Sequence, residues 1–519
     1  MRKLAVLALA ASMAFGQQKG FDKQASAGFS SITASDLKAH LTFLASDELE
    51  GRETSFRGQK VAAQYIAAVF QKLGLKPVGD NGSYFQQFEL DVFKPGRETN
   101  MVLTSSAGST QFMFGKDLLT TATKDTTITA PAVFVGFMDA YLSPEEEVSL
   151  TDRIVIAFAG RRSEALDPSA PRRRISYRLF RNAAAVVIVT TDPLDNYLES
   201  FANTIEKGSM GLKDSPRRQR GAPFVITGTT AGSKVLSQIP MTIGELHALT
   251  ARDSTYGPVP LDKISLTLDF KVIHEIRTAE NVVGLLEGSD KTLKNEYVVL
   301  TAHYDHVGVH AATGEIYNGA DDDGSGTSVI LELAEAFVSN PFKPRRSILF
   351  MTVAGEEKGL LGSSYYTQHP LFPLDRTIAN INIDMVGRID EKHEQSGSTP
   401  YVYVIGSDKI STELDSLLNA ANKQTVRLAL DYEYNDDNDP NQFYRRSDHY
   451  NFARNGIPIV FFFTGVHEDY HQPTDTVEKI EFERMQQIGQ LVYATAWKVA
   501  AFSRMLRKDG KPSVYTTGR

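Results

Sequence analysis

The sequence predicts an α/β fold in which helices sandwich a largely parallel mixed sheet, with a small β-rich domain inserted into it. From residue 264 onward, continuous apolar runs alternate with stretches of helical periodicity. Apolar runs of this kind are typical of strands buried on both faces, and their alternation with helices is typical of a parallel sheet. Between residues 125 and 260 the chain instead shows short β-rich runs separated by loops rich in Pro, Gly and Arg. A length of 519 residues suits one large domain and one smaller one.

These changes of pattern divide the chain into segments. Residues 1–16 have the features of a signal peptide: a basic start, a short apolar run and small residues before Gln17. We therefore expect an exported protein, periplasmic or extracellular, and no later stretch is apolar enough to span a membrane. The remaining segments are the first part of the main domain (17–124), the insert (125–260), the rest of the main domain (261–505) and a C-terminal tail (506–519).

The first part of the main domain begins with two expected helices, over 36–49 and 58–73, followed by a strand over 84–90. In the second helix, apolar side chains recur at helical spacing and Gly74 follows as a C-terminal cap. In the insert we expect a mainly β domain with one or two helices, and strands over 132–137, 154–158 and 184–189.

The rest of the main domain alternates strands with helices. The apolar runs predict strands over 297–302, 347–354, 378–383, 401–405 and 457–463. Helical periodicity predicts a helix over 325–338 and a long amphipathic helix that begins near residue 481.

Composition excludes several classes of function. The chain contains no cysteine, which removes disulfides, thiolate ligands and a cysteine nucleophile, so its chemistry must use oxygen and imidazole groups. The net charge of −8 is spread along the chain. Because nucleic-acid binding needs a concentrated basic face, this charge argues against a nucleic-acid partner.

Candidate metal ligands follow the predicted strands at their carboxyl ends. These residues are His303, Glu356 and Glu357, Asp384 and His471, and they come after four different strands. In an open α/β sheet, ligand sites gather at the carboxyl ends of the strands. Four strand ends that each deliver a histidine or a carboxylate therefore predict one shared site.

A run of three aspartates, framed by Gly319 and Gly324, adds a carboxylate on a turn before a helix. Alone, it would suit a helix N-terminus. Beside His303 and Glu357 we interpret Asp321 as a ligand that bridges two metal ions, since two zinc ions about 3.5–4 Å apart need a ligand that spans them. The remaining positive charge favours a bridging hydroxide as nucleophile, and one member of the Glu356–Glu357 pair can move the proton. Asp305 can orient the ring of His303 from its other nitrogen.

Seven short motifs occur in an order and spacing that resemble peptidase family M28, the zinc aminopeptidase and glutamate carboxypeptidase group. The resemblance extends over most of residues 36–505. The motifs are LASDELEGR (44–52), AHYDHVG (302–308), NGADDDGSG (318–326), AGEEKGLLGS (354–363), NIDM (382–385), SDH (447–449) and YHQPTDT (470–476).

The resemblance implies a role for each candidate. His303 and Asp384 would bind one Zn²⁺, Glu357 and His471 a second, and Asp321 would bridge them, so that two Zn²⁺ ions are expected per chain. Glu356 would be the general base, Asp305 would orient His303, and Tyr444 would stabilise the oxyanion. The family pattern gives no ligand role to His306, His449 or His467, for which we expect packing or hydrogen-bonding roles. The insert is similar to the protease-associated domain of many secreted members.

The expected function is an exported exopeptidase with a peptide substrate, most simply an aminopeptidase that removes N-terminal residues. A carboxypeptidase of the same family is an alternative, because Arg445 and Arg446 could face a substrate carboxylate. A glutaminyl cyclase would use a single zinc, which the five-ligand set disfavours. A receptor-like binding protein of the same fold is disfavoured because every expected ligand and the base are present.

Overall fold

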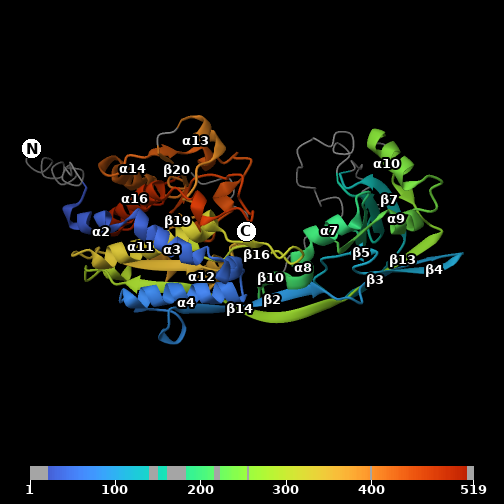
Figure 1. Ribbon diagram of the computed structural model, residues 1–519, viewed down its shortest axis with the longest axis horizontal. Helices are drawn as coiled ribbons and strands as arrows, with labels where there is room; N and C mark the ends of the chain where they lie inside the picture. Colours follow the sequence, from blue (N-terminus) through green and yellow to red (C-terminus); the bar gives the residue numbers. More distant parts are fainter. Residues whose placement is uncertain are drawn as a thin grey trace, which may run out of the picture. The chain divides into compact units, whose positions relative to one another are not determined.

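The computed structural model describes residues 21–139, 150–160, 183–215, 222–253, 256–397 and 400–510. The signal peptide expected over 1–16, and residues 511–519 of the expected tail, lie outside these ranges. The chain divides into two compact units: unit 1 comprises Met1–Glu89, Thr278–Val309 and Glu315–Arg519, and unit 2 comprises Leu90–Arg277 and His310–Gly314. The blue N-terminal helices and the red C-terminal helix in Figure 1 belong to the same unit, so the insert interrupts one domain. Among the described residues, no helix is both long and apolar enough to cross a bilayer.

The larger sheet is mixed and has ten strands. Its central strands β18, β15, β19 and β22 are mutually parallel, whereas β14 and β20 flank them antiparallel. In spatial order the strands are β10 (Ser209–Leu212), β2 (Phe85–Pro95), β14 (Val272–Leu286), β18 (Ser347–Val353), β15 (Tyr297–His303), β19 (Thr377–Ile383), β22 (Ile459–Phe463), β20 (Tyr401–Ile405) and β21 (Ala429–Asp431), with β1 (Lys76–Pro77) paired to β14. The predicted α/β class and its mixed sheet are confirmed, with the parallel pairing concentrated in the central strands and several outer pairs antiparallel.

Helices cover both faces of the central strands, as the alternation of side chains along β18 shows. Leu349 and Met351 pack with Tyr366 of α12 (Leu361–Gln368) and Phe452 of α15 (His449–Ala453). On the other face, the ring of Phe350 lies near the rings of Phe337 in α11 (Gly326–Ser339) and Phe70 in α4 (Arg57–Lys72). Phe337 also contacts Tyr493 of the long helix α16 (Phe482–Ala501), so α4, α11 and α16 share this face. Both faces of β18 are buried, and apart from Ser347 and Thr352 its residues are apolar.

The first predicted helix ends earlier than expected. Helix α3 covers Ala34–Leu44, and a short 3-10 segment over Asp47–Arg52 follows instead of further helix. Within it, Glu50 and Gly51 adopt positive φ. A side chain at Gly51 would approach the carbonyl oxygens of Tyr317 and Gly308 to 2.3 and 2.7 Å, so this tight turn requires glycine.

Unit 2 is larger than the predicted insert, because it covers residues 90–277 and not 125–260. The predicted start at 125 is wrong for a structural reason. Strand β13 (Ile264–Phe270) pairs antiparallel with β3 (Asn100–Ser105) and β6 (Thr126–Ala130), and β3 pairs with β4 (Gly108–Met113). This four-stranded sheet joins segments from both sides of the predicted insert, so its outer strands belong to unit 2.

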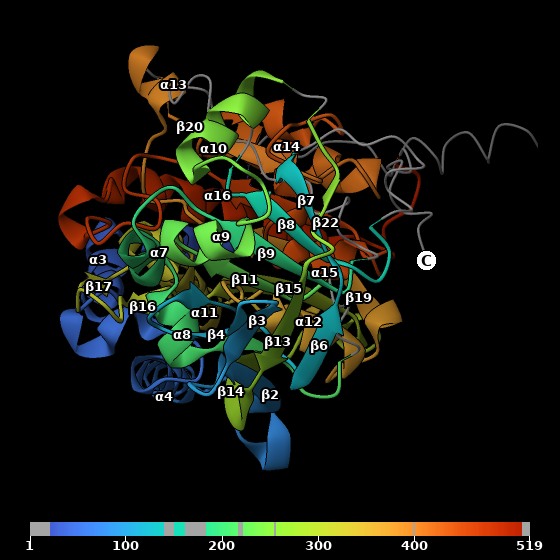
Figure 2. The same ribbon diagram turned by 90° about the vertical axis from the view of Figure 1, so that its right-hand side faces the viewer.

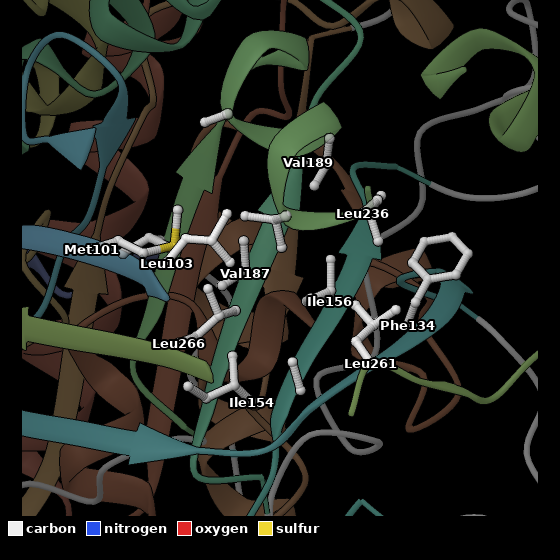
Figure 3. Close-up of a cluster of buried hydrophobic side chains, with 14 of the residues drawn as sticks. Met101, Leu103, Phe134, Ile154, Ile156, Val187, Val189, Leu236, Leu261 and Leu266 are labelled. Carbon is white, nitrogen blue, oxygen red and sulfur yellow. The ribbon is translucent and has the colours of Figure 1, made fainter. Parts of the chain in front are cut away.

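The second sheet of unit 2 has six strands and can be followed in Figure 2. Its order is β12 (Val259–Pro260), β7 (Ala132–Phe137), β8 (Ile154–Phe158), β9 (Ala185–Val189), β11 (Phe224–Thr227) and β5 (Leu118–Leu119), and β7, β8, β9 and β11 are parallel. Figure 3 shows Ile154, Ile156 and Val187 directed toward Met101 and Leu266 of the four-stranded sheet.

Four described helices accompany the six-stranded sheet: α7 (Leu194–Ser200), α8 (Ala202–Lys207), α9 (Thr229–Val235) and α10 (Ile243–Arg252). Apolar residues of α9 and α10 join the core on the face shown in Figure 3, whereas those of α7 and α8 pack on the opposite face. Unit 2 is therefore an α/β body, with more helix than the one or two elements expected. Its similarity to a protease-associated domain stays a prediction.

Candidate metal centre and pocket

The predicted strand-end residues meet at one edge of the larger sheet. His303 is the last residue of β15, Glu356 and Glu357 follow β18, and Asp384 follows β19 directly. His471 lies in the loop after β22. Because these four strands are parallel, their carboxyl ends coincide. The sheet thus explains why residues separated by up to 168 positions, from 303 to 471, become neighbours.

Asp322, and not the predicted Asp321, lies between the two histidines. Its Oδ1 is 3.1 Å from His303 Nε2, and its Oδ2 is 3.0 Å from His471 Nε2. Asp321 instead accepts a hydrogen bond from the backbone N–H of Gly387 at 2.6 Å, and its other oxygen faces His467 Nε2 at 3.1 Å. The prediction of Asp321 as the bridging carboxylate is therefore wrong by one residue.

The turn that carries the aspartates directs their side chains to different partners. Asp475 accepts hydrogen bonds from the backbone N–H groups of Asp321 and Asp322, which fixes the first half of the turn. Asp323 accepts from the N–H groups of Gly326, Met385 and His303, and so ties the turn to α11 and to two strand ends. Only Asp322 keeps both carboxylate oxygens directed at side chains.

Two groups of donor atoms lie close enough to hold a metal ion. The first comprises His306, Asp322, Glu357 and His471, and the second comprises His303, Asp323 and Asp384. In the second group His303 Nε2 is 3.5 Å from Asp384 Oδ1. Both oxygens of Asp323 already accept backbone hydrogen bonds, so Asp322 Oδ1 is the better third donor there. One carboxylate, Asp322, then faces both groups.

His306 lies among the candidate ligands, although the family pattern gives it no ligand role. Its side chain is fully buried, and neither ring nitrogen makes a hydrogen bond. Its Nδ1 lies 2.9 Å from Glu357 Oε1, at ion-pair distance but outside hydrogen-bonding geometry. His449 and His467 do behave as expected, because their Nε2 atoms contact the carbonyl oxygen of Tyr444 and the carboxylate of Asp321.

Hydrogen bonds from neighbouring residues hold the candidate ligands in place. His303 Nδ1 lies 3.1 Å from the backbone carbonyl oxygen of Asp305 and 3.8 Å from its carboxylate. Asp305 therefore orients the ring through its main chain, while its carboxylate accepts from Thr54 Oγ1 at 2.6 Å and from the backbone N–H of Glu356 at 3.2 Å. Ser447 Oγ donates to Asp384 at 2.6 Å. Such contacts hold ligand rings and carboxylates in one orientation.

Glu356 lines a pocket above this centre but belongs to neither donor group. Burial raises the pKa of its carboxyl well above the usual range, Glu357 and Asp384 add to the increase, and His303 opposes it. Burial alone would lower the pKa of His303, but the Asp384 and Asp322 carboxylates outweigh it and raise that pKa. The pocket is also lined by the charged or polar residues His303, Asp322, Asp384, Arg446 and Tyr470 and by the apolar residues Met385, Phe443, Phe461, Phe463 and Val466.

Tyr444, the predicted oxyanion stabiliser, does not line this pocket. It belongs to a short 3-10 turn, and its ring packs near Tyr450 and beneath the ammonium of Lys409. Burial raises its pKa. The tyrosine that lines the pocket is Tyr470, whose ring stacks on His471 with centroids 4.0 Å apart. Tyr470 lies inside the YHQPTDT motif, which could have identified it.

Arg52 is a residue whose role the sequence did not reveal. It is 1% exposed, and its guanidinium donates to the backbone carbonyls of Leu44, Tyr304, Asn318 and Gly319. It thereby joins the end of α3 to the residue after His303 and to the loop that precedes the aspartate turn. The nearby acidic side chains that favour its charge are Asp323, Asp322, Asp475 and Asp305. A fixed buried cation balances this carboxylate cluster.

Comparison with known proteins agrees with this geometry. Residues 281–496 match the model of peptidase family M28. Aminopeptidase YwaD of Bacillus subtilis is 32% identical over 253 residues, which cover 46% of this chain and 47% of that protein. The chain spans about half the length of the curated relatives it matches.

Two solved structures share the fold across nearly the whole chain. An aminopeptidase from Aneurinibacillus sp. strain AM-1 superposes with a TM-score of 0.55 at 20% identity, covering 94% of this chain and 96% of that one. A zinc aminopeptidase from Bacillus subtilis, called BSAP, gives 0.51 at 22% identity, covering 93% and 97%. The matching segment, residues 281–496, contains all of the strand-end residues that converge at the candidate centre, so this part of the chain is similar to peptidase family M28.

Proposed function

We propose that the protein is a two-zinc exopeptidase that removes N-terminal residues from peptides. One observation carries the proposal: the Asp322 carboxylate directs one oxygen at His303 and the other at His471, at 3.1 and 3.0 Å. A carboxylate in this position can join two metal sites, with Asp384 completing one and Glu357 the other.

The donor set fits zinc. It consists of imidazole nitrogens and carboxylate oxygens, the ligands that zinc takes where cysteine is absent. The donor-to-donor distances of 3.0–3.5 Å around His303 and His471 match the edge of about 3.3 Å expected for tetrahedral ligands at about 2.0–2.1 Å from one ion. When bound, two zinc ions would lower the pKa of a coordinated water and polarise the peptide carbonyl.

The chain's own residues supply the remaining functions. Glu356 is the acidic pocket residue outside both donor groups, which suits it to accept a proton from water and to return it to the leaving amine. Asp305 keeps Nδ1 of His303 engaged, so that Nε2 faces the donor group. The apolar pocket wall would hold a substrate side chain and exclude bulk water.

Support for the aminopeptidase direction comes from the relatives, which are named aminopeptidases. One observation favours the carboxypeptidase alternative: Arg446 lines the pocket, stacked over the ring of Phe443 at 4.9 Å. A panel of aminoacyl chromogenic amides and of N-blocked peptides with free C-termini separates the two. We expect cleavage of the amides; cleavage of only the blocked peptides would assign the alternative.

The catalytic part is tested by Glu356→Gln beside Glu335→Gln, an exposed glutamate of α11 as control. Glu356→Gln should retain both zinc ions and lower kcat by about 10²–10⁴-fold, the usual contribution of a general base. The control should match the wild type. Near-normal turnover of Glu356→Gln would remove this residue as the base, and active protein free of transition metal would refute the zinc proposal.

Export belongs to the same proposal, supported by the basic start and apolar run of residues 1–16. Mature protein recovered outside the cytoplasm should begin near Gln17, which N-terminal sequencing can establish. Recovery of an uncleaved N-terminus from the cytoplasm would contradict it.

A further inference from the structure

The ring of His306 is completely buried, yet neither of its nitrogens makes a hydrogen bond. Glu357 Oε1 is also buried without one, and it lies 2.9 Å from His306 Nδ1. Leaving buried polar groups without a partner is unfavourable. The two atoms face each other at ion-pair distance, within a group of donor atoms that also includes Asp322 and His471.

We propose that these donor atoms bind one metal ion and that His306 is a fourth protein ligand at the His471 site. The inference rests on the proposed two-zinc function and adds a ligand to it. The donors are His306 Nδ1, Asp322 Oδ2, Glu357 Oε1 and His471 Nε2, which the structure groups around one position.

The distances among these donors describe a coordination shell. Glu357 Oε1 lies 2.9 Å from His306 Nδ1 and 3.1 Å from His471 Nε2. Asp322 Oδ2 lies 3.0 Å from His471 Nε2 and 3.8 Å from His306 Nδ1. These four edges surround the value of about 3.3 Å expected for a tetrahedron of ligands at about 2.0–2.1 Å. Two nitrogens and two oxygens at such spacing form a closed zinc shell.

The backbone makes room for the ring of His306. Gly319 has φ +58°, and a side chain there would approach Cδ2 and Cγ of His306 to 2.4 and 2.5 Å. Glycine at 319 is thus required for the ring to occupy its position. The ring also meets that of His471 edge to face, with centroids 5.6 Å apart, so the two imidazoles approach the position from different directions.

A consequence is that the two sites are chemically unequal. Four protein donors close the His471 site, whereas the His303 site has Asp384, the second oxygen of Asp322 and space on the pocket side. Closed shells are typical of structural zinc, and open ones of catalytic zinc. The ion at the His471 site should therefore bind more tightly, and the exchangeable position should belong to the His303 site.

The test is a titration of metal-free, full-length protein with Co²⁺, followed by calorimetry and by the visible absorption of bound cobalt. Wild type should bind two ions, the first with the intense absorption of a four-coordinate site. His306→Phe, which keeps a ring but no donor, should weaken the first binding event by at least about 10-fold and lose that absorption. His369→Phe, which removes an exposed histidine, is the matched control.

The outcomes separate the inference from the proposed function. If His306→Phe binds two ions with wild-type affinity and spectrum, His306 is not a ligand, and the two-metal proposal stands. If the wild type binds no transition metal, both fail. Circular dichroism of the metal-free variants checks folding. If His306→Phe is unfolded, His306→Gln takes its place. The same weakening of the first metal-binding event is expected for it, and wild-type affinity and spectrum would again overturn the inference.

Discussion

Replacing Arg52 by methionine should strongly destabilise unit 1. The side chain is 1% exposed and donates to four backbone carbonyls: those of Leu44, Tyr304, Asn318 and Gly319. Methionine preserves much of the length of the side chain but none of its donors. The substitution also removes the cation beside the carboxylates of the aspartate turn.

The magnitude follows from these contacts. A hydrogen bond to a charged group contributes about 1.5–3 kcal/mol, so four at the lower limit sum to about 6 kcal/mol. Water can reach Asn318, where the contact is only partly buried, and local relaxation lowers the cost further. We expect a loss of about 4 kcal/mol in the free energy of unfolding, within the 3–5 kcal/mol typical of breaking a buried ionic contact. Arg52→Lys should lose less, because it keeps the charge but not the fork of donors.

The single tryptophan, Trp497, supplies the assay. It lies 3% exposed in α16, so its fluorescence during urea unfolding reports on unit 1. Arg57→Met is the control, since that side chain is 78% exposed with one ion pair to Glu50 at 3.6 Å, worth at most about 1 kcal/mol. If Arg52→Met unfolds within 1 kcal/mol of the wild type, the buried guanidinium does not hold the aspartate turn in place.

Three further predictions concern the site and pH. Asp322→Asn should weaken both metal-binding events, because the Asp322 carboxylate faces both donor groups. Asp321→Asn should still bind two ions. The metal content of each variant after dialysis tests this, and the reverse pattern would restore Asp321 as the bridge. Tyr444→Phe should leave kcat within about threefold of the wild type, since this ring does not line the pocket. Removal of an oxyanion donor typically lowers kcat by about 10²–10³-fold. A loss of that size in steady-state kinetics would contradict the prediction. Burial lowers the pKa of His40 to about 4, below its unfolded value, so below pH 6.5 the unfolded chain binds a proton that the folded protein does not. Stability should fall by up to about 3 kcal/mol between pH 6.5 and 4, and urea unfolding at both pH values should show a smaller difference for His40→Gln.

The sequence predicted the strands and helices of the main domain closely because their signals are local. Tyr401–Ile405 was predicted without error, and Tyr297–His303 and Ser347–Val353 within one residue at one end. Strands buried on both faces are rich in apolar residues, which makes them recognisable in the sequence even where a buried polar residue such as Thr301 or Asn382 interrupts the run. The same property located His303, Asp384 and the glutamate pair, since each follows a strand end.

The errors arose where neighbouring residues are chemically alike or where pairing is long-range. Nothing in composition distinguishes Asp321 from Asp322, because the choice depends on how Asp475 and Asp323 hold the turn. Tyr444 and Tyr470 differ only in the direction that their loops give to the rings. The start of the insert was missed because β3 and β4 belong to a sheet completed by β13, more than 150 residues later in the chain.

The position of Asp322 also has a thermodynamic consequence. A carboxylate with one oxygen toward each histidine means that an ion at either position orders and partly neutralises a ligand of the other. The two binding equilibria would then be linked, and the factor by which the first ion alters the affinity for the second must equal the factor in the opposite order. A binding isotherm for two metal ions at this centre would therefore be described by the two intrinsic affinities and one coupling constant.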